Sequence, residues 1–246
     1  DRLKKKEQII LFINRRGYAG FISCRSCGEA VKCPHCDVSL TFHRPDRLVC
    51  HYCGYEEKMP DKCPKCSSPY IGTFGLGTEK VEEIVKKDFP TARVLRMDGD
   101  TTTGKNGHEA ILESFKNGEA DILIGTQMIV KGHDFEKVSL VGILAADLSL
   151  FLGDFRAAET TYELLVQAAG RAGRGRYRGK VVIQTYNPDH YVIQAAATGN
   201  YKDFYSKEIR YRRLGEYPPE THLLAVILFA AKAEEVSRGA KILAGF

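Results

Sequence analysis

The stretch CRSCGEAVKCPHCDVSLTFHRPDRLVCHYCGYEEKMPDKCPKC, Cys24 to Cys66, contains all eight cysteines of the 246-residue chain. They form four Cys-x-x-Cys pairs: Cys24/Cys27, Cys33/Cys36, Cys50/Cys53 and Cys63/Cys66. Each pair places two thiolates on one tight turn, and zinc prefers four sulfur or nitrogen ligands in a tetrahedral arrangement. The sequence therefore predicts two structural zinc ions, each held by four cysteines.

Two other uses of paired cysteines fit this stretch less well. A disulfide framework is typical of secreted domains, and nothing in the sequence indicates an oxidising compartment. A thioredoxin-like redox site needs one Cys-x-x-Cys pair at the start of a helix that follows a strand. The neighbouring His35, His43 and His51 are not expected to be ligands, because eight thiolates already complete two sites.

The spacing favours a nested pairing without deciding it. The segment between the inner pairs contains a candidate strand, Val38 to His43, and a turn at Pro45-Asp46, as in the hairpin of a zinc ribbon. In the nested arrangement one ion is held by Cys33, Cys36, Cys50 and Cys53, and the other by Cys24, Cys27, Cys63 and Cys66. Consecutive and interleaved pairings stay open, and cadmium-113 or cobalt couplings to assigned cysteines would separate the three. Structural zinc contributes on the order of 10 kcal/mol in small domains, so this segment, poor in apolar residues, is expected to need the metal to fold.

The sequence on both sides of the cysteines predicts an α/β domain. Ile9 to Ile13 is a continuous apolar run of the kind that parallel strands show when both their faces are buried. The alternation of helices and strands after the cysteines favours a doubly wound, RecA-like parallel sheet into which the zinc-binding segment is inserted. The expected elements are a helix from Thr78, a strand Arg93 to Met97, a helix around Ala110, Ile111, Leu112 and Phe115 closed by Asn117-Gly118, strands Asp121 to Ile124 and Leu140 to Ala145, a helix Thr160 to Arg171, and a strand Val181 to Thr185.

The expected organisation has three parts. A discontinuous α/β lobe spans residues 1–22 and 68–215, the zinc-binding insertion spans 23–67, and the start of a further α+β domain spans 216–246. Around Tyr217-Pro218-Pro219 the pattern changes, and the last part is predicted to contain a strand, His222 to Phe229, and a helix from Ala233. The sequence starts without methionine and runs directly into a core strand, so we expect a piece of a longer protein.

Composition argues against a membrane protein and permits a nucleic-acid partner. With 43% hydrophobic and 27% charged residues, the chain can bury a core of ordinary size. Its longest apolar run, Leu223 to Ala231, is too short to cross a bilayer, and no secretion signal is evident. The formal net charge is +5, with positive residues clustered between Arg171 and Lys180 and between Arg210 and Arg213. Such clusters can neutralise phosphates, although a solvated basic face has the same pattern.

The segment QAAGRAGR, Gln167 to Arg174, carries the most specific chemistry outside the cysteines. Gln167, Arg171 and Arg174 are spaced i, i+4 and i+7, so a continuous helix would place them on one stripe. Two guanidinium groups there can reach one anion, and arginine binds phosphate bidentately. Gly170 and Gly173 indicate close backbone approach. An exposed basic helix end is the alternative.

QAAGRAGR resembles motif VI of superfamily 2 helicases, and GTQMIVKGHDF, Gly125 to Phe135, resembles their motif V. The order of the motifs is similar to that in the replication-restart helicase family of primosomal protein N′ (PriA). The further motifs are NRRGY from Asn14 to Tyr18, the four cysteine pairs, GLGTE from Gly75 to Glu79, DFRAAE from Asp154 to Glu159, and YPP from Tyr217 to Pro219. The resemblance covers essentially the whole chain and implies the second RecA-like lobe of a DNA motor. One departure is Gly153, where the family usually has proline.

The resemblance also implies roles for single residues. Arg171 and Arg174 would act as arginine fingers on ATP, and Gln167 would help to sense the nucleotide. Gly132 and Asp134 would line the ATP cleft, with the carboxylate near the ribose. Thr126, Gln127 and Lys131 would couple that cleft to bound DNA. The helix start at Thr78 is a candidate phosphate contact, since helix N-termini bind anions, and a simple N-cap threonine is the alternative.

By the same resemblance, the family unwinds DNA from 3′ to 5′ with ATP and Mg²⁺ and reloads the replication machinery at stalled forks. The implied partners are forked and single-stranded DNA, primosome and replication-restart proteins, and single-stranded DNA-binding protein. The implied location is the bacterial cytoplasm, in association with the nucleoid. The lobe with the Walker A lysine and the Walker B acids is not in this sequence, so the chain alone is expected not to hydrolyse ATP.

GDTTTGKN, Gly99 to Asn106, matches the Walker A pattern up to its last position, where Asn106 replaces the hydroxyl residue that coordinates Mg²⁺. It is not expected to act as a phosphate loop, and turnover by the isolated chain that Lys105→Ala abolishes would contradict this. Two other functions stay open: a zinc-dependent nucleic-acid or protein-binding module on a non-hydrolysing lobe, and a superfamily 2 relative that acts on RNA. DNA-stimulated ATPase activity, its loss in Arg174→Ala, and a comparison of RNA with forked DNA would separate them.

Overall fold

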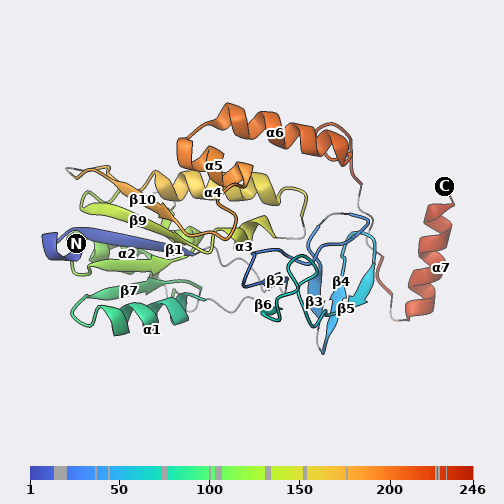
Figure 1. Cartoon of the computed structure of the whole chain (residues 1–246), viewed down its shortest axis with the longest axis horizontal. Helices are drawn as coiled ribbons and strands as arrows, with labels where there is room; N and C mark the ends of the chain where they lie inside the picture. Colours follow the sequence, from blue (N-terminus) through green and yellow to red (C-terminus); the bar gives the residue numbers. More distant parts are fainter. Residues whose placement is uncertain are drawn as a thin grey trace. The chain divides into compact units, whose positions relative to one another are not determined.

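The computed structural model of the chain is shown in Figure 1. It describes residues 1–13, 21–36, 38–43, 45–73, 77–99, 101–102, 107–130, 134–151, 154–175, 177–224, 226, 228–230 and 232–245. Two compact units are present, Asp1–Glu208 and Ile209–Phe246. The zinc-binding segment belongs to the first unit.

A five-stranded parallel sheet organises the first unit, in the order β10-β9-β1-β8-β7. Its strands are β1 (Gln8–Ile13), β7 (Val94–Met97), β8 (Ile122–Gly125), β9 (Val138–Leu144) and β10 (Lys180–Ile183). The central strand, β1, pairs with β8 on one side and with β9 on the other. The sheet therefore grows outward from β1 in both directions, as the predicted doubly wound fold requires.

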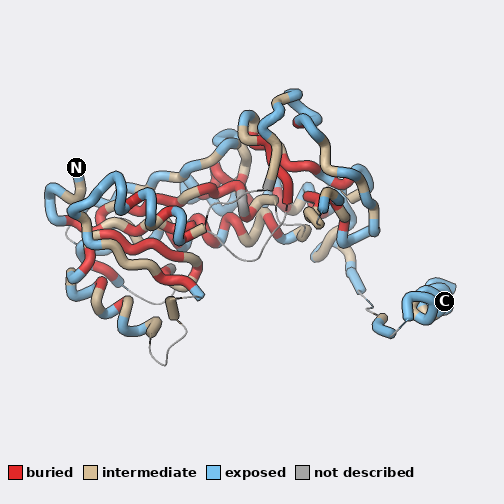
Figure 2. The backbone as a smooth tube through the Cα atoms, turned by 90° about the horizontal axis from the view of Figure 1, so that it is seen from below, coloured by how far each residue is buried: buried red, intermediate tan, exposed pale blue. Residues whose placement is uncertain are grey.

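Both faces of β1 are apolar, as its uninterrupted hydrophobic sequence predicts. Ile10 and Phe12 join the larger core cluster, together with residues of α2 (Gly107–Asn117), α4 (Ala157–Ala169) and α5 (Tyr191–Thr198). Ile9, Leu11 and Ile13 face the other way and pack with α1 (Thr78–Asp88). Figure 2 shows this buried backbone running through the sheet. The period of two along β1 thus separates two cores, one on each face of the sheet.

The segment after β1 forms two small antiparallel sheets with a core of their own. β2 (Ile22–Cys24) pairs with β6 (Ile71–Thr73), and β3 (Thr41–His43), β4 (Arg47–Val49) and β5 (Glu56–Lys58) form a three-stranded sheet. The buried cluster here consists of Ile22, Val31, Cys33, Val38, Leu40, Leu48 and Cys50. The predicted hairpin of a zinc ribbon is therefore present, with its turn at Pro45-Asp46.

Several elements of the first unit and of its border were not predicted from the sequence. They are the 3-10 turns η1 (Leu3–Lys5) and η2 (Gln127–Val130), helix α3 (Asp147–Leu150), and helices α5 and α6 (Tyr201–Leu214). The α5 sequence is a short alanine-rich segment, and it is a helix because Val192, Ile193, Ala195 and Ala196 pack onto the core. His190 caps it by accepting a hydrogen bond from the backbone N–H of Val192 at 3.3 Å.

Two sequence-based expectations need correction. The predicted helix Thr160 to Arg171 is α4, Ala157–Ala169, and it ends at Gly170, so Arg171 and Arg174 follow the helix instead of lying along it. The expected strand His222 to Phe229 is not a strand in its described residues, 222–224, 226 and 228–229. Leu224 and Phe229 are about nine-tenths exposed, so the apolar run finds no sheet to join. The predicted helix from Ala233 is present as α7 (Ala233–Ala244).

In the part of the chain that the structure describes, no helix is both long enough and apolar enough to cross a bilayer.

Candidate zinc centres and arginine site

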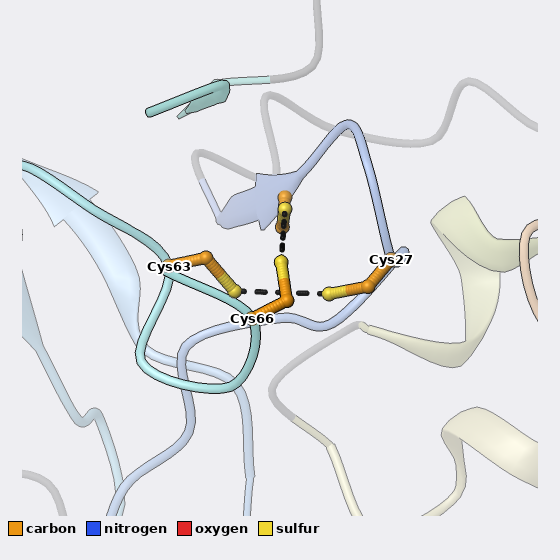
Figure 3. Close-up of side chains that lie close together, drawn as sticks. Cys27, Cys63 and Cys66 are labelled. Carbon is orange, nitrogen blue, oxygen red and sulfur yellow. Dashed lines mark hydrogen bonds between the residues drawn. The ribbon is translucent and has the colours of Figure 1, made fainter. Parts of the chain in front are cut away.

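The eight cysteines lie in two groups of four, and the grouping is the nested one. Cys24, Cys27, Cys63 and Cys66 form site 1, and Cys33, Cys36, Cys50 and Cys53 form site 2. Within each group all sulfur atoms lie within 4.8 Å of one another. In Figure 3 the sulfurs of Cys27, Cys63 and Cys66 point toward one another.

The distances between sulfurs fit a tetrahedral metal and not disulfide bonds. Cys24 Sγ lies 3.6 Å from Cys66 Sγ, Cys27 Sγ lies 3.7 Å from Cys63 Sγ, and Cys33 Sγ lies 3.5 Å from Cys53 Sγ. Zinc–sulfur bonds of about 2.3 Å place the corners of a tetrahedron about 3.8 Å apart. A disulfide needs about 2.05 Å, and all eight cysteines are free thiols. Four thiol donors at this spacing support zinc at both sites.

All four Cys-x-x-Cys turns share one backbone pattern. The N–H of the first cysteine donates to the carbonyl five residues later, in the pairs Cys24/Glu29, Cys33/Val38, Cys50/Tyr55 and Cys63/Ser68, at 2.8 to 2.9 Å. In three turns the residue after the second cysteine, Gly28, Gly54 or Ser67, has a positive φ of 74°, 75° or 58°. This left-handed position turns the chain back so that both sulfurs face the same point.

The electrostatics of site 1 favour a bound cation. Burial opposes ionisation of Cys24, but the N–H groups of Cys27 and Ser26 and the Cys66 thiol lower the pKa of Cys24 to about 6. For Cys27, burial and the neighbouring sulfurs of site 1 raise the pKa to about 12. Four crowded sulfurs cannot all ionise together unless a positive ion balances their charge.

The zinc-binding segment contacts the α/β lobe at two points near the carboxyl ends of strands β9 and β10. In site 1, Gly28 packs directly on Tyr186, which follows β10, and a Cβ atom at this glycine would lie 2.3 Å from Tyr186 Cβ. In site 2, the hydroxyl of Tyr52 accepts a hydrogen bond of 3.2 Å from the backbone N–H of Phe155. Phe155 lies two residues before α4. No sequence pattern singled out Tyr52, which lies between Cys50 and Cys53 in one of the metal-binding turns.

The second candidate site contains Asp134, Arg171 and Arg174. One oxygen of the Asp134 carboxylate, Oδ1, forms an ion pair with the guanidinium of Arg174 and lies 3.8 Å from Nη1 of Arg171. Arg174 is held further by its Nε, which donates to the Gly170 carbonyl at 2.6 Å. Burial, and then the charge of Arg174, lower the pKa of Arg171, whereas Asp134 acts in the opposite direction. The structure therefore brings Asp134 and Arg174, 40 positions apart in the sequence, into contact beside Arg171.

Glycines bring the arginine loop, defined here as residues 170–175, against the segment before β9. Gly173 has a φ of 76°, and its N–H donates to the Val138 carbonyl at 3.1 Å. A Cβ atom at Gly175 would lie 2.0 Å from the Glu136 carbonyl oxygen. The expected close approach is thus present at Gly173, and Gly175, for which it was not predicted, shows one as well. At Gly170 the nearest atoms belong to the turn of its own helix, so this glycine marks only the helix end.

The structure places the remaining candidate residues as follows. Gln167 is exposed on α4. Thr126 and Gln127 follow directly after β8, at its carboxyl end, and Gln127 is buried. Thr78 is fully buried and donates its hydroxyl to Asp98, so this hydroxyl is not open to a phosphate. The N-cap of α1 is Gly77 and not Thr78. Lys131 and Gly132 lie outside the described residues, as do the NRRGY motif, Gly153 and Lys105.

Comparison with protein-family models gives two matches. Residues 33–58 match the PriA DNA helicase Cys-rich region (CRR) domain, and residues 71–176 match the helicase conserved C-terminal domain. The first match contains site 2, and the second contains Asp134, Arg171 and Arg174. The parallel sheet, the two four-cysteine sites and these matches define a helicase-type α/β lobe with an inserted zinc ribbon.

Curated relatives identify the family more narrowly. The chain is 52% identical to "Replication restart protein PriA" of Bacillus subtilis (strain 168), over 98% of this chain and 30% of that protein. It is 48% identical to the protein of the same name from Synechocystis sp., over 95% of this chain and 29% of that protein. The chain belongs to the PriA family of replication restart proteins. It spans about 30% of the length of these relatives.

Proposed function

We propose that this chain forms the second motor lobe of an ATP-dependent DNA helicase that moves 3′ to 5′ and acts in the restart of stalled replication forks. The observation that carries this proposal is the convergence of Arg171 and Arg174 on Asp134. It brings the motif V-like and motif VI-like segments to a single anion-binding point. Two guanidinium groups there would stabilise the charge that develops on a transferred γ-phosphoryl group.

Residues at one end of the lobe would contact the nucleotide, and residues at the other end would contact DNA. Arg171 and Arg174 would contact nucleotide that is held by the lobe carrying the phosphate loop and the Mg²⁺ ligands. Thr126 and Gln127 follow β8 at its carboxyl end, and with Lys131 they would contact the DNA strand. Zinc, when bound, would hold together the Cys-x-x-Cys turns of the inserted ribbon. Tyr52 and Gly28 would fix that ribbon to the lobe.

Partners follow from the same proposal. Forked and single-stranded DNA would be the substrates, and primosome and replication-restart proteins, with single-stranded DNA-binding protein, would be the protein partners. The family membership supports these partners. The role of each residue rests on the resemblance of its segment to helicase motifs V and VI.

A chimera would test the proposal. The corresponding segment of the Bacillus subtilis protein would be replaced by this chain, and ATP hydrolysis would be measured with and without forked DNA. DNA-stimulated hydrolysis is expected, and Arg174→Ala is expected to lower kcat by about 10³-fold or more. Arg178→Ala, which removes an exposed arginine of the same basic cluster, is the matched control and is expected to retain activity.

The chimera also separates the alternatives. No stimulation, or an unchanged kcat in Arg174→Ala, would favour a zinc-dependent binding module on a non-hydrolysing lobe. Stronger stimulation by RNA than by forked DNA would favour an RNA-directed relative.

A further inference from the structure

Asp134 differs from its two arginine partners in its exposure. Its side chain is 70% exposed, whereas that of Arg171 is 12% exposed and that of Arg174 is 43% exposed. Arg174 is fixed at Nε by the Gly170 carbonyl, which leaves its terminal nitrogens to face the carboxylate. The carboxylate can thus swing toward solvent while the arginines stay in place.

Backbone contacts fix the segment that carries the Asp134 carboxylate next to the arginine loop. The N–H of Gly173 binds the Val138 carbonyl, and Gly175 packs against the backbone of Glu136, only two residues beyond Asp134. A side chain at Gly175 would collide with the backbone of Glu136 and push the arginine loop away from this segment, whereas one at Gly173 would collide with Gly179. Asp134 and the arginines are therefore held together by main-chain contacts, whether or not their charges attract.

Two guanidinium groups this close repel each other, and the charge of Arg171 is poorly solvated because the side chain is largely buried. A nearby anion offsets both effects. In this structure the anion is the Asp134 carboxylate, whose planar pair of oxygens matches guanidinium donors much as a phosphate does.

We infer that Asp134 occupies, with its own carboxylate, the position between Arg171 and Arg174 that a phosphate group of a polyphosphate ligand takes. Such a ligand must displace the carboxylate to bind. The Asp134 carboxylate thus competes with external anions and lowers the affinity of the two arginines for them. A multiply charged ligand can displace it. The identification of that ligand as ATP rests on the proposed function, whereas the competition itself does not.

Titration of this chain with inorganic tripolyphosphate tests the inference without involving ribose or hydrolysis. Isothermal titration calorimetry would compare the wild type with Asp134→Asn and with Glu136→Gln. Both variants remove one negative charge from the same segment, and among the described residues no contact of the Glu136 side chain with either arginine is recorded. An ion pair with an exposed partner contributes at most about 1 kcal/mol, so Asp134→Asn is expected to bind tripolyphosphate about two- to fivefold more tightly than Glu136→Gln.

Equal affinities of the two variants would overturn the inference, as would weaker binding by Asp134→Asn or no saturable binding by any of the three proteins. A measurement on the wild type guards against misfolding of the variants. The ¹³C resonance of the Asp134 carboxylate should move toward that of a free aspartate as tripolyphosphate saturates the site, and an unchanged resonance would also overturn the inference. If the chimera fails to hydrolyse ATP while these results hold, the helicase proposal fails and the competition stands.

Discussion

Replacing Gly175 by alanine is expected to separate the arginine loop from the segment that carries Asp134. The added Cβ atom would lie 2.0 Å from the carbonyl oxygen of Glu136, and 2.7 Å and 2.8 Å from its carbonyl carbon and Cα. Non-bonded carbon atoms normally sit about 3.5 Å apart or more, so the two backbones must move apart by roughly 1 Å. Because both partners are main chain, no side chain can rotate away. Overpacking of this kind costs about 1–3 kcal/mol.

Guanidinium chloride unfolding, followed by circular dichroism, would measure the loss in free energy of unfolding, and titration with tripolyphosphate would measure the effect on the arginines. Gly72→Ala is the matched control, because the described residues leave open space around its Cβ position. The reasoning is refuted if Gly175→Ala and Gly72→Ala lose the same stability to within about 0.5 kcal/mol, the range of ordinary surface substitutions. A stability loss without any change in anion affinity would refute only the link to the arginine site.

Three further outcomes are expected. The double variant Cys33→Ser/Cys53→Ser should bind one zinc ion by native mass spectrometry, because both cysteines belong to site 2, whereas consecutive pairing would remove both ions. Tyr52→Phe should speed hydrogen exchange of the Phe155 amide, because this amide loses its acceptor, while the zinc content stays at two ions. An unchanged exchange rate would mean that the hydrogen bond does not persist in solution. The Ser139 hydroxyl, and to a lesser degree Arg2, lower the pKa of Glu7 in the folded chain. Glu7 therefore contributes stability at neutral pH that is lost as the pH falls through its folded pKa. In Glu7→Gln the free energy of unfolding should fall less steeply as the pH is lowered.

The sequence predicted the centre of the sheet well because β1, β8 and β9 are largely buried on both faces. Every predicted strand of the α/β lobe is present within a few residues, and the apolar run of β1 is buried as expected of a central parallel strand. The sequence favoured the nested zinc pairing but did not decide it. The spacing of the cysteines constrains the turn around each Cys-x-x-Cys pair, but it does not determine which two pairs share one ion. The expected strand His222 to Phe229 failed for a related reason. Its apolar pattern needs a partner strand, and the described part of the second unit offers none.

The sequence singled out Arg171 and Arg174, but the helical geometry that it implied for them was wrong. The i, i+4, i+7 spacing implied a helical stripe, but Gly170 ends α4, and the convergence arises from a loop instead. Asp134 entered the sequence analysis only through its likeness to motif V, as a ribose contact. Its ion pairs with both arginines depend on Gly175 lying against Glu136, a long-range backbone contact that leaves no periodic signal in the sequence. Tyr52 and Gly28 were missed for the same reason.

The zinc ribbon and the arginine loop lie at opposite ends of the parallel strands. The ribbon follows the carboxyl end of β1, and its contacts with Phe155 and Tyr186 lie beyond the carboxyl ends of β9 and β10. The arginine loop follows the far end of α4, where Gly173 binds Val138 at the amino end of β9. A helix of 13 residues is about 20 Å long. Zinc therefore cannot act on the arginines directly. An influence of the ribbon on the arginines can pass along α4 from Phe155 to Gly170, or along β10, which connects Gly179, packed on Gly173, with Tyr186. Thr126 lies at the carboxyl end of β8, the same edge as the ribbon, so an effect of zinc on the proposed DNA contact of Thr126 would need no such path.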